Sequence, residues 1–462
     1  MQKTIEELIM LFRRKRKVLV IGLDSTPPRL LFREFKDKLP NFREMMDSGI
    51  CAPLRTIHPP ITIPAWMAMC TGKDAGEMGV YGFRTRKGNS YTEFSLSFSH
   101  AFSGVRKVWD ELAELGKRSV LVGIPPSYPV YPVNGKMVSC FLCPDSTKDY
   151  TYPSSLKGEI ESLVGEYIFD VVFRTEERDK LITQAFEMTE KRFKVVEHLL
   201  KKEKWDFFMF VEIGVDRVQH AFWKYYDPEH PLHEPGHRYK DVILDYYKLL
   251  DDGVGRLLSA VDKNTTVLVV SDHGAKAMKG AFCINEWLIQ KGYLVLKEYP
   301  KEVKSLEDLD VDWSRTRAWG WGGYYGRIFI NKKGREAQGV VEEKDYEPLR
   351  EELKEALEGE RDKFGFPWRT KVYRPEELYR DPKGELPDLM AYFDDLSYRS
   401  AGTVGHGKLF LDENDTGPDD AVHDWEGVFV AWRKDGRPAV SGDLDDLSIL
   451  DVHRIILEAF RT

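Results

Sequence analysis

The sequence predicts an α/β protein built on a mostly parallel central sheet with helices on both faces. The first observation is a set of short, largely apolar runs: KVLVIGL at 17–23, WDFFMFVEI at 205–213 and TVLVV at 266–270. Strands covered on both faces of a sheet have this character. The second observation is that long helical segments separate these runs, as in βαβ units. The third is the length of 462 residues, which favours two domains or one large domain with an insertion.

The elements expected in the first part of the chain follow from apolar periodicity and from proline. Three prolines between 59 and 64 exclude helix before Thr62, and Pro64 suits the first turn of a helix. In chain order we expect a helix capped by Thr4 at 4–13, a strand at 17–23, a helix at 41–48, a strand at 52–57, and a helix at 64–69; a helix at 105–115 and a strand at 119–124 follow.

The second part continues the same alternation and then interrupts it. We expect a helix at 176–202, a strand at 205–213, a helix at 239–261, a strand at 266–270, strands at 387–393 and 428–432, and a last helix at 445–460. Between 277 and 385 the alternation changes, so we expect residues 1–276 and 386–462 to form the core and 277–385 to form an inserted, cap-like region. The aromatic and glycine-rich stretch at 317–331 is either one wall of a pocket or a packed hairpin.

Composition narrows the class of protein. Hydrophobic residues make up 42% and charged residues 31%, as in a globular protein, and the net charge of -8 gives no basic surface for a stable nucleic-acid partner. Five cysteines in so long a chain predict reduced thiols. No run reaches the length of a membrane helix, and the first residues place acids before bases, the reverse of a secretory signal. We therefore expect a cytoplasmic protein without a membrane partner.

Polar residues that suit metal ions stand where the apolar runs end. Asp272 and His273 follow the strand at 266–270, and Asp24 follows the strand at 17–23. Asp216 and His220 follow the strand at 205–213 and share one helix face if this segment is helical. In an open α/β sheet, sites lie beyond the carboxyl ends of the strands. The alternatives are a capping Asp at 24 or 272 and a surface acid–imidazole pair at 216 and 220.

Thr62 lies just before the expected helix that starts near Pro64. Free amides and the helix dipole at such a place favour a bound phosphate. The alternative is that the threonine only caps the helix.

Taken together, these residues resemble the alkaline phosphatase superfamily, and most closely its type I phosphodiesterase and nucleotide pyrophosphatase branch with related phosphohydrolases and phosphomutases. The resemblance lies in the order Asp, Thr, Asp-x-x-x-His, Asp-His and a final His. His423 fits the last position because it precedes Gly-Val-Phe-Val and a strand, and His406 in a glycine-rich loop is the fallback. The resemblance covers roughly 17–275 and 385–462 and implies an alkaline-phosphatase-like fold.

The resemblance also implies two divalent ions, most simply Zn²⁺ with Mn²⁺ as second choice. By position, one ion would be held by Asp24, Asp272, His273 and Thr62, and the other by Asp216, His220 and His423. Two divalent cations would balance the three carboxylates and a threonine alkoxide, which would otherwise repel one another in one cleft.

The implied reaction is hydrolysis of a small-molecule phosphate ester in which Thr62 attacks phosphorus and forms a phosphothreonine intermediate. Because a hydroxyl is barely ionised at neutral pH and no Ser/His/Asp order is present, the metal would activate it. The family segment Thr-Phe-Pro-Asn reads Thr-Ile-Pro-Ala here, so Ala65 cannot donate a side-chain hydrogen bond, and Arg84 is one candidate replacement.

The departure at Ala65 leaves several reactions open. Phosphodiesters and nucleotides come first, and a phosphomonoesterase or a phosphomutase or phosphotransferase on the same site is the alternative. The Cys/Ser-x-Pro-x-Arg pattern of sulfatases is absent around Thr62, which disfavours sulfate esters. A non-catalytic metal- or ligand-binding module would not need Thr62. The oligomeric state does not follow from the sequence.

Overall fold

The computed structural model describes residues 17–435 and 446–460. The helix expected at 4–13 lies outside these residues. The central sheet has the strand order β2-β19-β9-β1-β8-β5-β6-β7. Its strands are β1 (Lys17–Leu23), β2 (Ile50–Arg55), β5 (Ser119–Val122), β6 (Gly135–Val138), β7 (Thr151–Tyr152), β8 (Phe207–Glu212), β9 (Thr265–Val270) and β19 (Glu426–Arg433).

The sheet is mostly parallel, as predicted. β1 pairs in parallel with both β8 and β9, and β5 pairs in parallel with both β6 and β8. The antiparallel exceptions are β7 beside β6, and β19 between β9 and β2. Because three neighbouring parallel strands, β9, β1 and β8, end at the same edge, the residues that follow them meet there.

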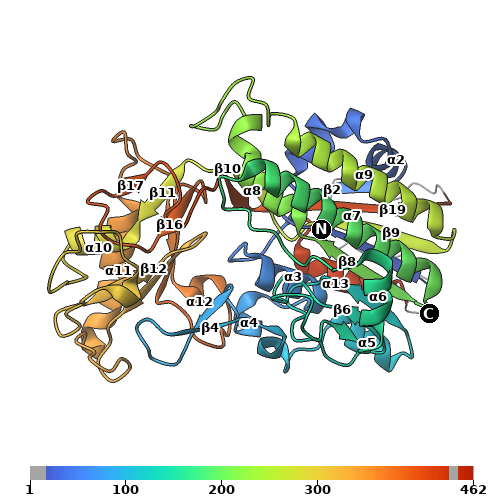
Figure 1. The fold of residues 1–462 in the computed structure, drawn as a ribbon. Helices are drawn as coiled ribbons and strands as arrows, with labels where there is room; N and C mark the ends of the chain where they lie inside the picture. Colours follow the sequence, from blue (N-terminus) through green and yellow to red (C-terminus); the bar gives the residue numbers. More distant parts are fainter. Residues whose placement is uncertain (1–16, 436–445, 461–462) are drawn as a thin grey trace.

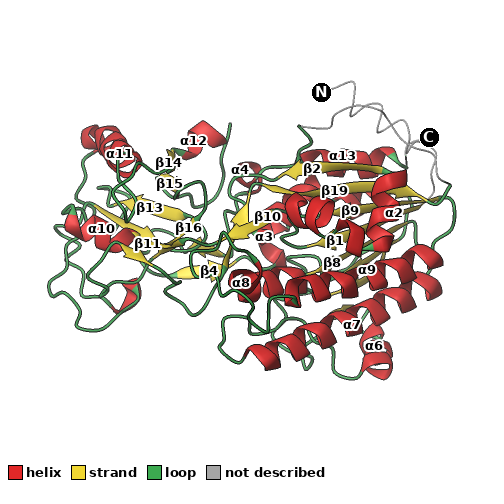
Figure 2. Ribbon diagram, turned by 90° about the horizontal axis from the view of Figure 1, so that it is seen from above, coloured by secondary structure: helices red, strands yellow, loops and turns green. Residues whose placement is uncertain are grey.

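Helices cover both faces of the sheet (Figures 1 and 2). Alternate residues of β1 show the two layers: Leu19 and Ile21 pack with the helices on one face, and Val18 and Val20 with those on the other. The first layer contains α2 (Pro40–Ser48), α6 (Leu156–Val164), α7 (Arg178–Lys202), α8 (Gly214–Tyr226) and α9 (Val242–Ala260). The second contains α3 (Thr62–Thr71), α4 (Ala75–Met78), α5 (Val108–Glu114) and α13 (Ile449–Glu458).

A smaller lobe lies to one side of the core (Figure 1). The chain leaves the core through β10 (Gly274–Ala277) and returns through β18 (Ala421–Asp424), which pair as an antiparallel ribbon. We call residues 278–420 the inserted region. It contains β11 (Gly280–Cys283), α10 (Ile284–Gln290), β12 (Ala318–Trp321), β13 (Gly326–Ile330), α11 (Glu343–Glu358), β14 (Lys371–Tyr373), α12 (Pro375–Leu378), β15 (Leu389–Tyr392), β16 (Tyr398–Ala401) and β17 (Phe410–Leu411).

The position of β15 corrects one expectation. The apolar run at 387–393 does form a strand, but it pairs with β13 and β14 in a four-stranded sheet of the inserted region. It is buried, as a core strand would be, and its apolar composition cannot show which of two sheets it joins. The chain therefore rejoins the central sheet at β19 and not at 386.

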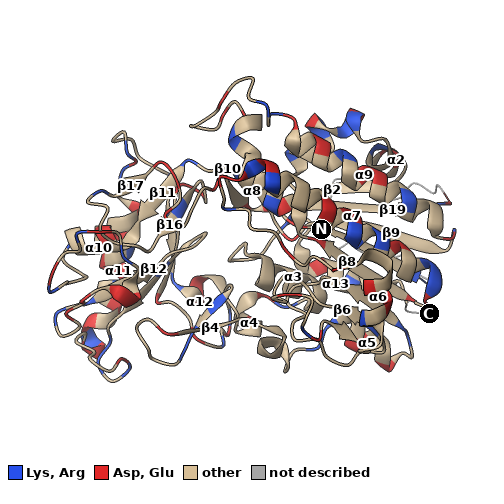
Figure 3. Ribbon diagram, in the orientation of Figure 1, with Lys and Arg blue, Asp and Glu red and all other residues tan. Residues whose placement is uncertain are grey.

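Three further features complete the description of the fold. A small hairpin of β3 (Arg84–Arg86) and β4 (Phe94–Leu96) follows α4. Among the described residues, no helix combines the length and the apolar character needed to cross a bilayer. Lys and Arg are interspersed with Asp and Glu along outer helices such as α6 and α9 (Figure 3).

Candidate active site

The first group of possible metal ligands is Asp24, Asp272 and His273, whose ligand atoms lie within 4.8 Å of one another. Asp24 directly follows β1 and the other two follow β9, so adjacent parallel strands deliver them to one place. His273 Nε2 lies 3.1 Å from Asp272 Oδ2 and 3.9 Å from Asp24 Oδ1. All three side chains are fully buried.

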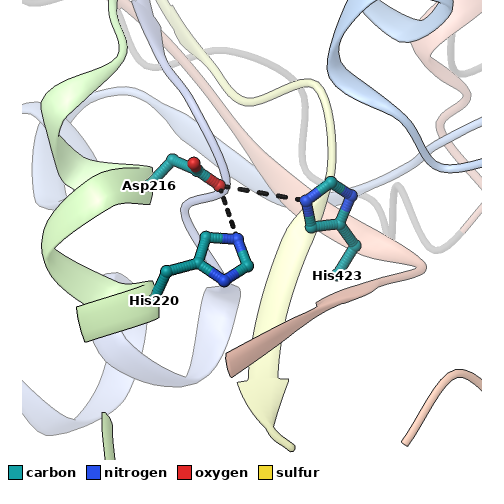
Figure 4. A group of neighbouring side chains, drawn as sticks. All are labelled: Asp216, His220 and His423. Carbon is teal, nitrogen blue, oxygen red and sulfur yellow. Dashed lines mark ion pairs between the residues drawn. The ribbon is translucent and has the colours of Figure 1, made fainter. Parts of the chain in front are cut away.

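The second group is Asp216, His220 and His423, also with ligand atoms within 4.8 Å of one another (Figure 4). Asp216 and His220 lie one turn apart on α8, as their spacing predicted. Asp216 Oδ1 is 3.2 Å from His220 Nε2 and 3.9 Å from His423 Nε2. His423 comes from β18, whose register opposite Ala275 of β10 places it beside His273.

The two groups adjoin. The rings of His273 and His423 stack with their centroids 3.8 Å apart, although one belongs to each group. Residues nearly 400 positions apart in the chain therefore form one buried cluster, assembled by three strand ends, the start of α8 and the β10–β18 ribbon.

Each of the three carboxylates has one occupied oxygen and one that accepts no hydrogen bond from the described residues. Asp24 Oδ2 accepts from Trp66 Nε1 at 2.6 Å, Asp216 Oδ2 from the Arg217 side chain at 2.8 Å, and Asp272 Oδ1 from the backbone N–H of Ser25 at 3.1 Å. The other oxygen of each is buried without a hydrogen-bond partner. Buried anionic oxygens are costly unless a cation or donor meets them, so this donor set fits metal ions.

The histidines are oriented by their second ring nitrogen. Nδ1 of His423 lies 2.6 Å from the carbonyl oxygen of Pro60, and Nδ1 of His273 lies 3.0 Å from that of Gly274. Nδ1 of His220 lies 2.7 Å from Asp419 Oδ1. A proton on Nδ1 leaves Nε2 with a lone pair, and all three Nε2 atoms face the carboxylates of the cluster.

Thr62 is the first residue of α3, and Ile61 occupies the cap position. The threonine hydroxyl lies 3.4 Å from His273 Nε2, and its side chain is buried. Its hydroxyl therefore points at the candidate ligands. The structure thus brings together all seven residues singled out from the sequence: Asp24, Thr62, Asp216, His220, Asp272, His273 and His423.

Comparison with protein families gives one match over most of the chain. Residues 18–419 match the family described as type I phosphodiesterase / nucleotide pyrophosphatase. The chain belongs to this family. Its members are metal-dependent phosphohydrolases of the alkaline phosphatase superfamily. A search of curated proteins gave no match.

Solved structures show the same fold at low sequence identity. Phosphonoacetate hydrolase from Sinorhizobium meliloti 1021, in complex with phosphonoacetate, has a TM-score of 0.63 and 14% identity, with 96% of each chain covered. An inactive variant of murine ectonucleotide pyrophosphatase / phosphodiesterase 5, in complex with AMP, has a TM-score of 0.56 and 15% identity, covering 96% of this chain and 95% of the other. The human form of the latter has a TM-score of 0.55 and 15% identity, covering 95% and 93%.

Burial dominates the electrostatics of this cluster. Burial and the neighbouring Asp216 charge raise the pKa of Asp24, and burial and the Asp24 charge raise that of Asp272. Burial lowers the pKa of His273 to about 4. Burial opposes charge on His220, yet Asp419 and the other groups around it hold its pKa well above the ordinary value. Divalent cations would relieve the repulsion between the carboxylates.

Asp419 is a functional candidate that sequence reasoning missed. Besides His220, it accepts hydrogen bonds from Arg174 at 2.9 and 3.0 Å and from Arg399 at 3.1 Å. It lies in the polar run before His423. The only sign of a functional role in the sequence is that this carboxylate stands four residues before a candidate ligand. His406, the fallback ligand, lies outside both groups and instead contacts Thr403 through Nε2 at 2.8 Å.

A cavity of about 440 Å³ adjoins the cluster. Its near end is lined by Ile61, Arg217 and Tyr324, which neighbour Thr62, Asp216 and His423; the ring of Tyr324 stacks on His423 at 3.7 Å. The sequence predicts that the stretch at 317–331 forms either a packed hairpin or one wall of a pocket. It does both, because β12 and β13 form an antiparallel hairpin and residues of this stretch line the cavity.

Proposed function

We propose that this protein is a two-metal phosphoesterase that hydrolyses phosphodiesters or nucleotide-type esters through a phosphothreonine intermediate on Thr62. The observation that carries the proposal is the position of the Thr62 hydroxyl. It is buried at the start of a helix, 3.4 Å from His273 of the first ligand group, and the adjacent Ile61 lines the cavity. A module that only binds metal would have no use for a hydroxyl there.

The ligand groups support two ions, with Asp24, Asp272, His273 and Thr62 holding one and Asp216, His220 and His423 holding the other. Mixed carboxylate and imidazole donors suit Zn²⁺ best, with Mn²⁺ second. When bound, two such ions supply the positive charge that favours an ionised Thr62 and offsets the charge of the phosphoryl group.

In the proposed reaction, Thr62 is the nucleophile and the start of α3 binds the phosphoryl group. Thr62 Oγ1 forms a bond to phosphorus while the bond to the leaving alcohol breaks, and the alcohol takes up a proton. Water then cleaves the ester on Thr62 and restores its hydroxyl. With a diester substrate, the intermediate keeps the second alcohol until release. Free amides in the first turn of α3 lie where they can donate to the phosphoryl oxygens, a task that the side chain of Ala65 cannot perform.

Two of the structural neighbours support a small-molecule substrate, because one binds phosphonoacetate and another binds AMP. The cytoplasmic location stays a prediction. The inserted region, which supplies one wall of the cavity, is proposed to act as the cap over the core.

The test compares hydrolysis of bis(4-nitrophenyl) phosphate and 4-nitrophenyl phosphate by protein loaded with Zn²⁺ or Mn²⁺. We expect faster cleavage of the diester, and faster cleavage of the monoester would indicate a phosphatase or mutase. Thr62→Ala should abolish turnover while leaving metal binding largely intact, and Thr62→Ser should retain part of the turnover. Mass spectrometry after an acid quench should show a phosphoryl adduct on the peptide containing Thr62. Undiminished turnover by Thr62→Ala would refute the proposal.

A further inference from the structure

The lining of the 440 Å³ cavity includes two arginine residues that come from different parts of the fold. Arg84 lies on β3, in the hairpin that follows α4 of the core, and Arg327 lies on β13 of the inserted region. The two are in contact, because an Nη atom of Arg327 donates to the carbonyl oxygen of Arg84 at 2.9 Å. The same cavity is lined by Tyr324, whose ring stacks on His423, and by both arginines.

The pair differs from the other arginines of the cavity. Arg174 and Arg399 are paired with Asp419, and Arg217 is paired with Asp170 and Asp216. Within residues 17–435 and 446–460, by contrast, neither Arg84 nor Arg327 forms an ion pair. The acidic residues that line this cavity are elsewhere engaged or exposed: Asp415 accepts from Thr403 at 2.8 Å, and Glu307 faces solvent.

Arg327 also has an unused donor. Its two Nη atoms donate to carbonyl oxygens of Arg84 and Gly322, whereas its Nε is buried and has no hydrogen-bond partner in the described chain. Burial lowers the pKa of Arg327, and the charge of Arg84 acts in the same direction. Arg327 is half-buried and Arg84 is exposed. Two neighbouring cations, one with a donor to spare, are stabilised by an anion that binds both.

Aromatic rings hold the two guanidinium groups in place. The guanidinium carbon of Arg84 lies 4.3 Å from the centre of the Phe94 ring, and that of Arg327 lies 5.2 Å from the centre of the Trp321 ring. Both rings line the cavity. A stacked ring takes up only the face of a guanidinium, so the N–H edge of Arg84 can meet an oxyanion. In Arg327 the free donor on that edge is Nε, because the Nη atoms donate to two carbonyl oxygens.

We infer that the substrate carries a second anionic group, a carboxylate or a phosphate, that binds to Arg84 and Arg327 while the phosphoryl group to be cleaved lies at Thr62. This inference rests on the proposed phosphoesterase function. It selects, among phosphate esters, small molecules with an oxyanion at each end and an apolar or aromatic part between them. Because the oxyanion contacts both the hairpin and the inserted region, its binding also ties the cap to the core.

The experiment measures binding of substrate analogues that cannot be hydrolysed, by isothermal titration calorimetry on the Zn²⁺-loaded protein. Butylphosphonate has one anionic end, 4-phosphonobutyrate adds a carboxylate, and butane-1,4-bisphosphonate adds a second phosphonate. Shorter and longer members of each series allow for the distance between the two ends. We expect the analogues with two anionic ends to bind about tenfold more tightly or better. The stronger of the two indicates which oxyanion is preferred.

Matched variants connect the effect to the two arginines. Arg84→Gln and Arg327→Gln should each abolish most of the preference for a second anion, and Arg327→Lys should restore part of it. Lys87→Gln removes one charge from the same hairpin at a side chain that is 67% exposed and outside the cavity, so it should keep the preference. Thermal unfolding of each variant checks that it folds.

The outcomes separate this inference from the proposed function. Equal affinity for one-ended and two-ended analogues at every length would overturn the second-anion inference alone, and so would a preference that survives in both glutamine variants. Failure of every phosphonate to bind, or full activity of Thr62→Ala, would overturn the proposed phosphoesterase site itself.

Discussion

Replacement of Asp419 by Asn tests whether the carboxylate behind His220 controls one metal position. Asp419 Oδ1 lies 2.7 Å from His220 Nδ1, and its Oδ2 accepts from both Arg174 and Arg399. An Asn side chain has nearly the same shape and can still accept from His220, but it carries no charge. With its oxygen toward His220, its amide nitrogen takes the place of Oδ2 and faces the N–H groups of both arginines, which lose their acceptor.

The magnitude has two parts. Loss of a group that orients a histidine ligand reduces metal affinity by about 10- to 100-fold, so the second group should bind Zn²⁺ more weakly by roughly 1.4–2.7 kcal/mol. The arginines lose a buried partner as well, since Asp419 is only 3% exposed, and removal of one member of a buried ion pair costs about 3 kcal/mol of folding free energy. The variant should therefore be both less stable and weaker in metal binding.

The assay is titration of metal-free protein with Zn²⁺ in competition with a chelator of known affinity, at a temperature where circular dichroism shows both proteins folded. Asp420→Asn is the control. Asp420 is the adjacent buried acid, but its side chain faces Lys224 at 3.9 Å, and it contacts His220 only through its backbone N–H. An unchanged Zn²⁺ affinity in Asp419→Asn, or an equal loss in Asp420→Asn, would show that Asp419 does not support the metal through His220.

Three further perturbations address stability and metal dependence. Trp66→Phe removes the donor to Asp24 Oδ2 and some buried ring volume, so urea unfolding should show a loss of about 3 kcal/mol, and a loss below 1 kcal/mol would contradict this. Zn²⁺ at 100 times its dissociation constant should add about 2.7 kcal/mol per site over chelator-treated protein; identical melting temperatures would count against two bound ions. In the folded protein, burial and the charge of Arg55 lower the pKa of His58 to about 4. As the pH is lowered, the unfolded chain binds a proton at His58 before the folded protein does. The free energy of unfolding therefore falls by up to about 3 kcal/mol between pH 6.5 and pH 4. His58→Phe should flatten that decline, and an unchanged slope would exclude His58 as its cause.

The parts of the fold that could be predicted are those where burial alone shapes the sequence. The run 17–23 becomes β1 without a change of boundary, because a strand covered by helices on both faces must be apolar along its whole length. The inserted region gave no such signal. Its strands are short, and its sheets are mostly antiparallel, with β11 and β16 as a parallel pair. Because β15 is as apolar as a core strand, sequence alone assigned it to the wrong sheet.

The candidate site divides in the same way. Residues such as Asp24 and Asp272 could be nominated because parallel strands bring their carboxyl ends together, and this rule needs only strand boundaries. Asp419 and Trp66 could not, because each acts through a hydrogen bond to a residue far away in the chain. Such contacts depend on how loops and helices pack onto the sheet, which apolar periodicity does not encode.

The arginines of the cavity show why the class of reaction is easier to predict than the substrate. The seven residues nominated for chemistry all come from the core or from the β18 strand that returns to it. The pair Arg84 and Arg327, however, forms only because Arg327 of the inserted region donates a hydrogen bond to the carbonyl oxygen of Arg84. Under the two proposals made above, the core holds the reacting phosphoryl group, and the inserted region contacts the other end of the substrate. Changes in the inserted region can therefore alter the preferred substrate while leaving the two ligand groups and Thr62 intact, so the unpaired arginines are the better guide to the substrate.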